Sequence, residues 1–458
     1  MLVKPEEVGL SSARLGRISD HLRRYIDAGK LAGTLTLVAR HGKIAYFEPQ
    51  GHLEIERKRP VTPDSIFRIY SMTKPIASVG LMMLWEQGRL QLDDPVHKFI
   101  PSWRDQRVFV GGNHPAWQTT PVERPMTVRD LLSHTSGLTY GFMERTNVDA
   151  AYRKLGIADR TRSGYTARDM VEELAALPLE FSPGTRWNYS VATDVVGHLI
   201  ELISGQRLDA YLREHVLQPL GMSDTSFVVT EEQSKRFAAN YQRQADDSLR
   251  LVDDPAKSIY RACAFFSGGG GLVSTAHDYF RFASMMLNKG ELDGIRLLGR
   301  KTVELMTMNH LPDGQDLTNL ALPGMFTETA YAGVGFGLGF SIMQSPARAQ
   351  IAGTAGEFAW GGAARHRVLD RSRRADGRCV HDADHANGFA CAVPAASRAA
   401  DTRLFGDYRI TRWRDNRRAY DARCTNERSS TRMTPDWAAR LATCACSASA
   451  ARASRYRS

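Results

Sequence analysis

The first fifty residues alternate apolar and polar positions with two different periods. From Ser11 to Ala28, apolar side chains recur at intervals of three and four and serines at the start can cap the first turn, which predicts an amphipathic helix. Residues 34–39 alternate polar and apolar at first, which indicates a strand. The tripeptide His41-Gly42-Lys43 is typical of a turn, and an apolar run follows over residues 44–47. Together these segments predict a β-hairpin.

Helical and strand patterns follow one another through the rest of the body. A second helix is expected to begin near Ser71, because residues 72–87 are rich in Ala, Leu, Met and Ile and end before a glycine. Residues from about 90 to 260 contain many loops and predict a mostly helical lobe. Short helices are expected at residues 128–133, 167–177 and 191–203. Strand-like patterns return at residues 334–342 and 358–363.

The order of these elements indicates how the chain is organised. A sheet that begins near residue 35 and is completed after residue 330, with helices between, requires both ends to build one α/β lobe. The predicted fold class is therefore α/β (α+β), with the helical lobe inserted into the sheet lobe.

The positive charge of the chain is concentrated near its end. The net charge of +10 would suggest a nucleic-acid partner, but from Arg365 to Ser458 there are 20 Arg, no Lys and 10 acidic residues. The remainder is balanced, with 40 basic and 40 acidic residues, so no nucleic-acid partner is predicted. The first residues lack the order of a secretory signal, and no apolar run approaches the roughly 20 residues that span a membrane. We expect a soluble cytoplasmic protein.

The cysteines, like the positive charge, are concentrated near the end of the chain. Cys263 lies in the body, whereas the other five cysteines lie after residue 378. No pair has the Cys-x2-Cys spacing of a zinc site, and Cys444 and Cys446 are too close for it. No metal site and no disulfide framework are predicted.

Ser71-Met72-Thr73-Lys74 is the first segment that suggests chemistry. Residues i and i+3 share one helix face, so the Lys74 amine can reach the Ser71 hydroxyl. The helix N-terminus adds N–H donors that would stabilise an oxyanion, and a deprotonated Lys74 could accept the serine proton. Taken alone the motif is weak, because a capping serine followed by a surface lysine explains most chance occurrences.

Six ordered stretches make the motif specific. They are Ser65–Pro75, Leu131–Leu138, Pro183–Ser190, Gln218–Met222, Gly268–Ser274 and Trp360–Gly362. With them the chain, over roughly residues 10 to 364, resembles the serine β-lactamase and penicillin-binding-protein superfamily, and specifically the class C β-lactamase-like esterases called family VIII carboxylesterases. The resemblance implies an antiparallel central sheet flanked by helices, plus a mostly helical lobe.

The resemblance also implies roles for individual residues. Ser71 would be the acylated nucleophile, Lys74 its base, and Tyr189 the residue that carries protons to the leaving group and from water. The oxyanion hole would be formed by the backbone N–H groups of Ser71 and Ala363. No metal or organic cofactor is implied. Without Ser71 and Lys74, Tyr189 would be interpreted as a core aromatic.

The segment Trp360-Gly361-Gly362 bears on the substrate. β-Lactamases and transpeptidases generally place Lys or His first in this triplet, next to a bound carboxylate, whereas Trp360 supplies no charge. In addition, Tyr189-Ser190-Val191 lacks the Asn found third in the corresponding β-lactamase motif. Both departures favour neutral esters, although packing of Trp360 on the sheet is compatible with either interpretation.

Three further features are expected to be structural. His134 lies within a matching stretch, but this mechanism requires no histidine. Asp194 is expected to organise a helix or loop. The run Gly268–Gly271 lacks the lysine that follows in a P-loop, so we expect it to let the backbone pass close to another segment.

The resemblance stops after Ala364. The family continues into two apolar strands and a closing helix, but residues 365–458 form an Arg- and Cys-rich mixture without a sustained period. We interpret this tail as a frameshifted or disordered segment that replaces those elements, and a real basic tail that binds nucleic acid is the alternative. Loss of the strands would expose a sheet edge and leave Ala363 unsupported.

The domain from residue 1 to 364 is therefore predicted to be a serine hydrolase that acts on small-molecule carboxylic esters through an acyl-Ser71 intermediate. One alternative is a β-lactamase or a D-amino-acid peptidase or amidase on the same machinery. The other is an inactive member that acts only as a binding protein.

Overall fold

The computed structural model describes residues 2–323, 331–362, 366–370 and 388–394, the last two ranges as backbone alone. The chain divides into compact units Met1–Arg398 and Ala399–Ser458, and the second unit lies outside the described residues.

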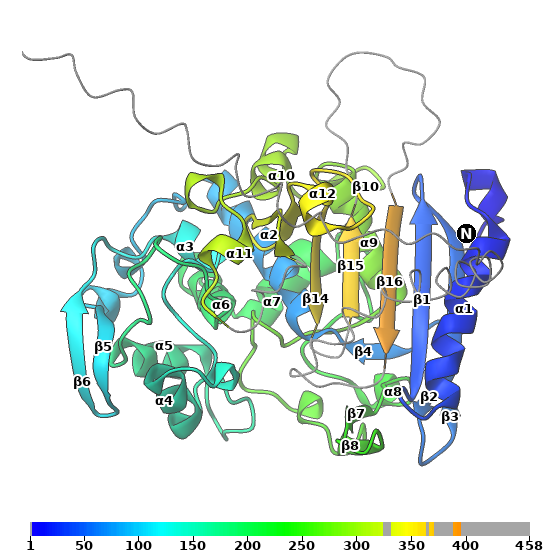
Figure 1. Ribbon diagram of the computed structural model, residues 1–458, viewed down its shortest axis with the longest axis horizontal. Helices are drawn as coiled ribbons and strands as arrows, with labels where there is room; N and C mark the ends of the chain where they lie inside the picture. The colour runs from blue at the N-terminus through cyan, green and yellow to red at the C-terminus, as the bar shows by residue number, and fades with distance from the viewer. Residues whose placement is uncertain (1, 324–330, 363–365, 371–387, 395–458) are drawn as a thin grey trace, which may run out of the picture. The chain divides into compact units, whose positions relative to one another are not determined.

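An antiparallel sheet of eight strands forms the core of the first unit (Figure 1). Its order is β12-β13-β14-β15-β16-β1-β2-β3, so strands from after residue 330 pair with the first strands of the chain. The strands are β1 (Gly33–Arg40), β2 (Lys43–Glu54), β3 (Arg59–Pro60), β12 (Val334–Phe336), β13 (Ser341–Met343), β14 (Phe358–Gly362), β15 (His366–Asp370) and β16 (Gly388–Pro394). This arrangement places β14, the strand of the Trp360 motif, inside the sheet.

The predicted hairpin is confirmed as β1 and β2. His41 and Gly42 form the turn with φ of 54° and 72°, and the glycine adopts this left-handed conformation without steric cost. On β1, Leu35 and Leu37 are completely buried, but Thr34 and Thr36 are only 1% and 4% exposed, so both faces of the strand are covered. The strand pairs with β2 on one side and β16 on the other.

Helices flank the sheet. The first predicted helix is α1 (Ser12–Asp27), and Ser11 caps it by accepting a hydrogen bond from the backbone N–H of Arg14 at 3.3 Å. Helix α1 packs against β2, and α9 (Ala276–Leu287) packs against β15, β16 and β1. Among the described residues, no helix is both long enough and apolar enough to cross a bilayer.

The second predicted helix, α2 (Thr73–Glu86), is almost entirely buried and packs against α6 of the helical lobe. The helices of that lobe are α3 (Val128–Leu132), α4 (Asn147–Leu155), α5 (Ala167–Ala175), α6 (Ala192–Ser204), α7 (Leu208–Leu212) and α8 (Glu231–Ser234). The lobe also holds the hairpins β5 (Arg107–Asn113) with β6 (Ala116–Pro121) and β7 (Asn240–Arg243) with β8 (Leu249–Asp253).

The remaining short elements connect these parts. Strand β4 (Ile66–Arg68), directly before the Ser71 segment, pairs with β9 (Val273–Thr275), directly after the glycine-rich run. The others are β10 (Glu291–Leu292), β11 (Ile295–Arg296), α10 (Arg300–Met306), α11 (Leu317–Leu320) and α12 (Pro346–Ala349). The pairing of β4 with β9 therefore brings two of the motif segments together.

Two expectations for the late strands need correction. The stretch 334–342 forms two strands rather than one, because a turn that includes Gly339, with φ of 96°, separates β12 from β13. The prediction that strand structure ends with residue 364 is wrong, since β15 and β16 fill the sheet between β14 and β1. Both strands stand in an Arg- and Asp-rich stretch of the sequence, whose composition outweighed the short apolar patterns. The frameshift hypothesis for the later tail stays a prediction, because residues 395–458 lie outside the described ones.

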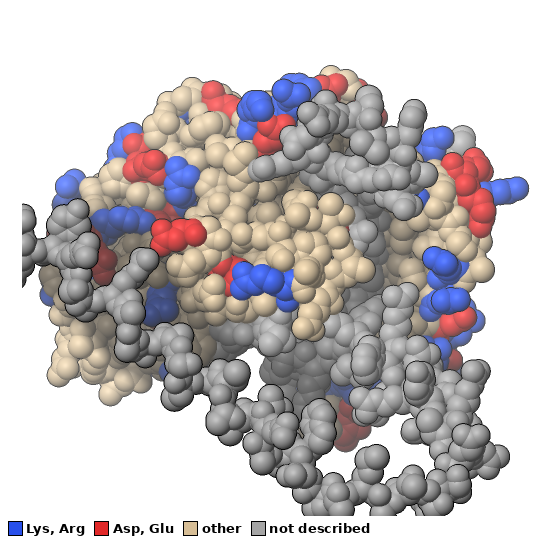
Figure 2. All heavy atoms as spheres, turned by 45° about the horizontal axis from the view of Figure 1, so that its top comes forward, with Lys and Arg blue, Asp and Glu red and all other residues tan. Residues whose placement is uncertain are grey.

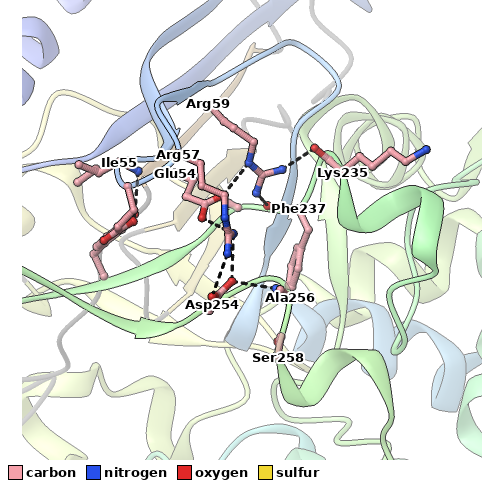
Figure 3. Close-up of polar contacts among 12 residues, drawn as sticks. Glu54, Ile55, Arg57, Arg59, Lys235, Phe237, Asp254, Ala256 and Ser258 are labelled. Atoms are coloured by element: carbon pink, nitrogen blue, oxygen red, sulfur yellow. Dashed lines mark hydrogen bonds and ion pairs between the residues drawn. The ribbon is translucent and has the colours of Figure 1, made fainter.

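An ion-pair network ties the β2–β3 connection to the segment after β8 (Figure 3). The buried carboxylate of Glu54 accepts hydrogen bonds from Arg57 and, at 2.7 Å, from Arg59. Arg57 also contacts Asp254 at 3.3 Å, and Arg59 donates to the carbonyl of Lys235 at 2.7 Å. The network therefore crosslinks the sheet to the helical lobe.

Candidate active site

Ser71 and Lys74 lie at the N-terminal end of α2. Ser71 belongs to a 3-10 turn, Tyr70–Met72, which leads directly into the helix, so α2 itself begins two residues after the predicted start. Lys74 is 1% exposed, whereas Ser71 is partly exposed. The Lys74 Nζ lies 3.3 Å from the Ser71 Oγ. The structure thus brings the two residues together as their spacing predicted.

Two oxygen atoms from distant segments complete the surroundings of the Lys74 amine. Its Nζ lies 2.9 Å from the hydroxyl of Tyr140 and 2.6 Å from the backbone carbonyl of Gly269. It also lies 4.6 Å from the ring centroid of Tyr189. Sequence reasoning missed Tyr140 and the Gly269 carbonyl. Tyr140 follows the second matching stretch by two residues, which is the signal that could have drawn attention to it.

Tyr189 contacts the candidate nucleophile. Its hydroxyl donates a hydrogen bond to the Ser71 Oγ at 2.5 Å, and the side chain is 5% exposed. Its ring packs at 5.0 Å from His134, 5.2 Å from Tyr140 and 5.3 Å from Trp360, measured between centroids. These contacts hold the phenol at one orientation toward Ser71.

The backbone before Tyr189 is held by a buried polar network. The Asn188 amide donates to the Leu138 carbonyl and to the Glu180 carboxylate, both at 2.9 Å. Arg145 lies 3.1 Å from Glu180 and donates to Asn188 at 2.7 Å. Burial raises the pKa of Glu180, and the neighbouring Thr146 and Arg145 partly offset this effect. The network positions the Tyr189 segment without contacting Ser71.

His134 lies behind the Tyr189 ring. Burial, and then the proximity of Lys74, lowers the pKa of His134 well below its ordinary value, so the imidazole is neutral. Its Nδ1 lies 3.2 Å from the Ser190 hydroxyl. These contacts fit the structural role predicted for this histidine.

Asp194 organises the glycine-rich run. Its carboxylate accepts a hydrogen bond from the Gly269 N–H at 3.0 Å and another from the Ser267 hydroxyl. A Cβ on Gly269 would lie 2.4 Å from the Asp194 Oδ2, and a Cβ on Gly268 would lie 2.5 Å from the Thr193 carbonyl oxygen. Glycine is therefore required for close approach, as predicted, and Asp194 has the predicted organising role.

The third motif lies on β14. Trp360 is 7% exposed and packs 5.1 Å from the Phe336 ring centroid. Gly361 and Gly362 pair with Arg367 and His366 of β15. Ala363, the predicted second donor of the oxyanion hole, lies outside the described residues, so its role stays a prediction.

No group of three or more His, Cys, Asp or Glu side chains suited to holding a metal ion is found in the described part of the chain.

Comparison with known proteins places this arrangement in a family. A family model described as Beta-lactamase matches residues 18–373. The chain belongs to the Beta-lactamase family. Esterase EstB of Burkholderia gladioli is 32% identical over 377 residues, covering 78% of this chain and 86% of the relative. Protein Rv1367c of Mycobacterium tuberculosis is 36% identical over 345 residues, covering 75% and 83%.

Solved structures show the same fold. EstCE1, described as a hydrolase with promiscuous acyltransferase activity, has a TM-score of 0.67 at 26% identity and covers 84% of this chain and 93% of its own. Unliganded simvastatin synthase LovD of Aspergillus terreus has a TM-score of 0.66 at 21% identity, with 84% and 94% coverage, and supports the fold alone. This member of the Beta-lactamase family is an enzyme of the serine hydrolase type.

Proposed function

We propose that this Beta-lactamase family member hydrolyses neutral carboxylic esters through an acyl-Ser71 intermediate. The observation that carries the proposal is the position of the Ser71 Oγ, which lies within hydrogen-bonding distance of both Lys74 and Tyr189. A serine nucleophile needs a base for its proton and an acid for the leaving group, and these are the two partners present.

In the proposed acylation, neutral Lys74 accepts the Ser71 proton while the Oγ forms a bond to the ester carbonyl carbon. The tetrahedral intermediate collapses when the C–O bond to the alcohol breaks. Tyr189 gives its proton to the departing alkoxide, and the Lys74 ammonium returns a proton to the Tyr189 oxygen. The alcohol leaves neutral, and Ser71 carries the acyl group.

Deacylation uses the same groups in reverse. Tyr189 passes its proton to Lys74, and its phenolate accepts a proton from water as the water oxygen attacks the acyl carbon. When the carbonyl–Oγ bond breaks, Ser71 recovers a proton from Lys74, and the carboxylic acid is released. At the end of the cycle Ser71, Lys74 and Tyr189 have regained their starting protonation states, and no step uses a metal or an organic cofactor.

The character of β14 supports neutral esters as substrates. The strand Phe358–Gly362 carries no charged side chain, and Trp360 packs against Tyr189 at 5.3 Å. A substrate carboxylate would therefore find no cation on this strand. EstB is named an esterase and EstCE1 a hydrolase, which adds support for ester hydrolysis.

The decisive assay compares p-nitrophenyl acyl esters with nitrocefin. We expect a measurable kcat/KM on short esters that exceeds the value on nitrocefin, and labelling of Ser71 by a fluorophosphonate probe. Faster turnover of nitrocefin, or of a D-alanyl peptide, would instead favour the β-lactamase or peptidase alternative. Folded protein that neither reacts with the probe nor turns over esters would favour a binding protein.

A small-molecule ester partner, a cytoplasmic location and the absence of a nucleic-acid or membrane partner stay predictions. On the face seen in Figure 2, Lys and Arg side chains are interspersed with Asp and Glu, and the residues coloured there form no continuous positive surface. Cell fractionation and a shift assay with duplex DNA and RNA test these points.

A further inference from the structure

The oxygen atoms around the Lys74 amine indicate which direction is left for the lone pair of its neutral form. The amine nitrogen has three oxygen neighbours, which are the Gly269 carbonyl at 2.6 Å, the Tyr140 hydroxyl at 2.9 Å and the Ser71 Oγ at 3.3 Å. An ammonium group donates three N–H bonds, whereas a neutral amine donates two and accepts one. If Lys74 acts as a base, one of its three oxygen neighbours must therefore face the nitrogen lone pair.

Two of the three neighbours take N–H bonds. A carbonyl oxygen only accepts, so Gly269 takes the first. The negative charge of the Asp194 carboxylate near the Tyr140 hydroxyl favours turning its proton away from the Lys74 amine, which leaves an oxygen lone pair for the second. The remaining direction is toward Ser71, whose Oγ already accepts a hydrogen bond from Tyr189 and can direct its own proton to Lys74.

One carboxylate, that of Asp194, acts on both acceptors of the Lys74 amine. Asp194 receives the Gly269 N–H at 3.0 Å, and burial together with the Asp194 charge raises the pKa of Tyr140 well above its ordinary value. The Tyr140 ring is fixed as well, because it stacks on Phe142 at 4.6 Å and packs against Tyr189 at 5.2 Å. The hydroxyl of Tyr140 is thus neutral and held in place.

We propose that Tyr140 is a positioning residue that, together with the Gly269 carbonyl, occupies both N–H bonds of neutral Lys74 and thereby aims its lone pair at the Ser71 hydroxyl. The proposal rests on the proposed function, in which Lys74 is the base. It adds a fourth side chain to the predicted set of Ser71, Lys74 and Tyr189. Tyr140 itself contacts neither the Ser71 Oγ nor the substrate in the proposed steps.

Replacement of Tyr140 by Phe tests the proposal, because it removes the hydroxyl and keeps the stacked ring. We expect kcat on a p-nitrophenyl ester to fall about tenfold or more while KM stays within about twofold, the scale of a lost hydrogen bond to a charged or reacting group. The matched control is Tyr211→Phe, which removes a buried hydroxyl that contacts the Gly80 carbonyl at 3.2 Å. The control should change kcat by less than about twofold.

The pH profile of kcat/KM separates positioning from general packing. Removal of the Tyr140 oxygen takes a hydrogen-bond acceptor from the amine that serves as base, so the acid limb should be displaced from its wild-type position. The other titratable groups that face this site are Tyr189, His134 and Asp194, and the substitution leaves all three in place. A purely structural role would lower the unfolding temperature and leave the limb where it is.

The outcomes are distinct from those for the proposed function. If wild-type protein hydrolyses esters, Ser71→Ala abolishes this activity, and Tyr140→Phe keeps wild-type kcat and the wild-type acid limb, the positioning role is overturned. If the wild type has no esterase activity, the proposed function fails first. If Tyr140→Phe does not fold, 3-fluorotyrosine at position 140 keeps ring and hydroxyl but weakens the acceptor, so kcat should fall about threefold, and an unchanged kcat overturns the proposal.

Discussion

The Lys74 site and the Glu54 network are two clusters of polar side chains with opposite electrostatics. Glu54, which is 1% exposed, has guanidinium groups from Arg57 and Arg59 as partners. Lys74, also 1% exposed, is surrounded by the uncharged oxygens of Ser71, Tyr140 and Gly269. Both clusters are buried in the same chain, but only one is paired with opposite charge.

The difference explains which cluster suits chemistry. The Glu54 carboxylate is paired with two guanidinium groups, so removal of the carboxylate would leave these cations without their partner, which costs stability. Among the described residues, the hydrogen-bonding partners of the Lys74 amine are uncharged oxygens, which suits the proton transfer proposed for it. We therefore expect substitutions at Lys74 to act on turnover and substitutions at Glu54 to act on stability.

The strongest test replaces the nucleophile and its base. Ser71→Ala should abolish ester hydrolysis, with kcat/KM reduced by at least about a thousandfold, and Lys74→Ala should cost nearly as much because the two residues act as a unit. Both are measured by p-nitrophenyl ester turnover, with circular dichroism to verify folding. Substantial activity in either variant would mean that Ser71 and Lys74 do not act as nucleophile and base.

Tyr189→Phe should lower kcat by about a hundredfold, the usual scale for the loss of a general acid or base. The ring contacts with His134, Tyr140 and Trp360 remain, so the unfolding temperature should change little. Turnover reduced only a few-fold would return Tyr189 to the role of a core aromatic that packs beside Ser71.

Glu54→Gln tests whether the Glu54 network acts on stability rather than on turnover. The substitution leaves Arg59 without its carboxylate, and we expect a loss of about 2 kcal/mol in the free energy of unfolding, moderated by the partial exposure of both arginines. Urea unfolding measures this loss. The value of kcat/KM should match that of the wild type once the folded fraction is taken into account, and a large decrease would mean that the network also serves the active site.

The smallest effect concerns His134, a buried group kept neutral beside Lys74. Its pKa is lowered in the folded state, so the unfolded state binds more protons below the ordinary value of about 6.5, and stability falls as pH decreases from there. The slope from this one group is at most about 1.4 kcal/mol per pH unit.

His134→Asn should reduce that slope, because asparagine does not titrate and tolerates the φ of 59° at this position. Unfolding free energies at pH 7.5 and pH 5.5 give the comparison. His310, whose pKa burial also lowers, retains its share of the pH dependence in both proteins. An identical slope in wild type and variant would show that His134 is not the group responsible.

The amino-acid pattern predicted much of the fold because it acts over short distances. The first helix, the β1–β2 hairpin and the helix after Ser71 follow from periods of 3.6 and 2 with turn residues between them. The Ser71 and Lys74 contact follows from a spacing of three on one helical face. Strands β15 and β16 escaped prediction because they stand in an Arg- and Asp-rich stretch of the sequence, and because pairing in the sheet depends on neighbours that a local pattern does not reveal.

By itself the sequence determined the class of chemistry, since Ser71, Lys74 and the motif around Tyr189 could be recognised from residue types and order. Only the tertiary structure decided how the base is held. Tyr140 and Gly269 lie 66 and 195 residues from Lys74, and Tyr189 lies 118 residues from Ser71. A short-range pattern of apolar residues carries no information about contacts between residues so far apart in the sequence. They are set by the packing of α2 against the helical lobe and by the pairing of β4 with β9, which bring the three segments around one amine.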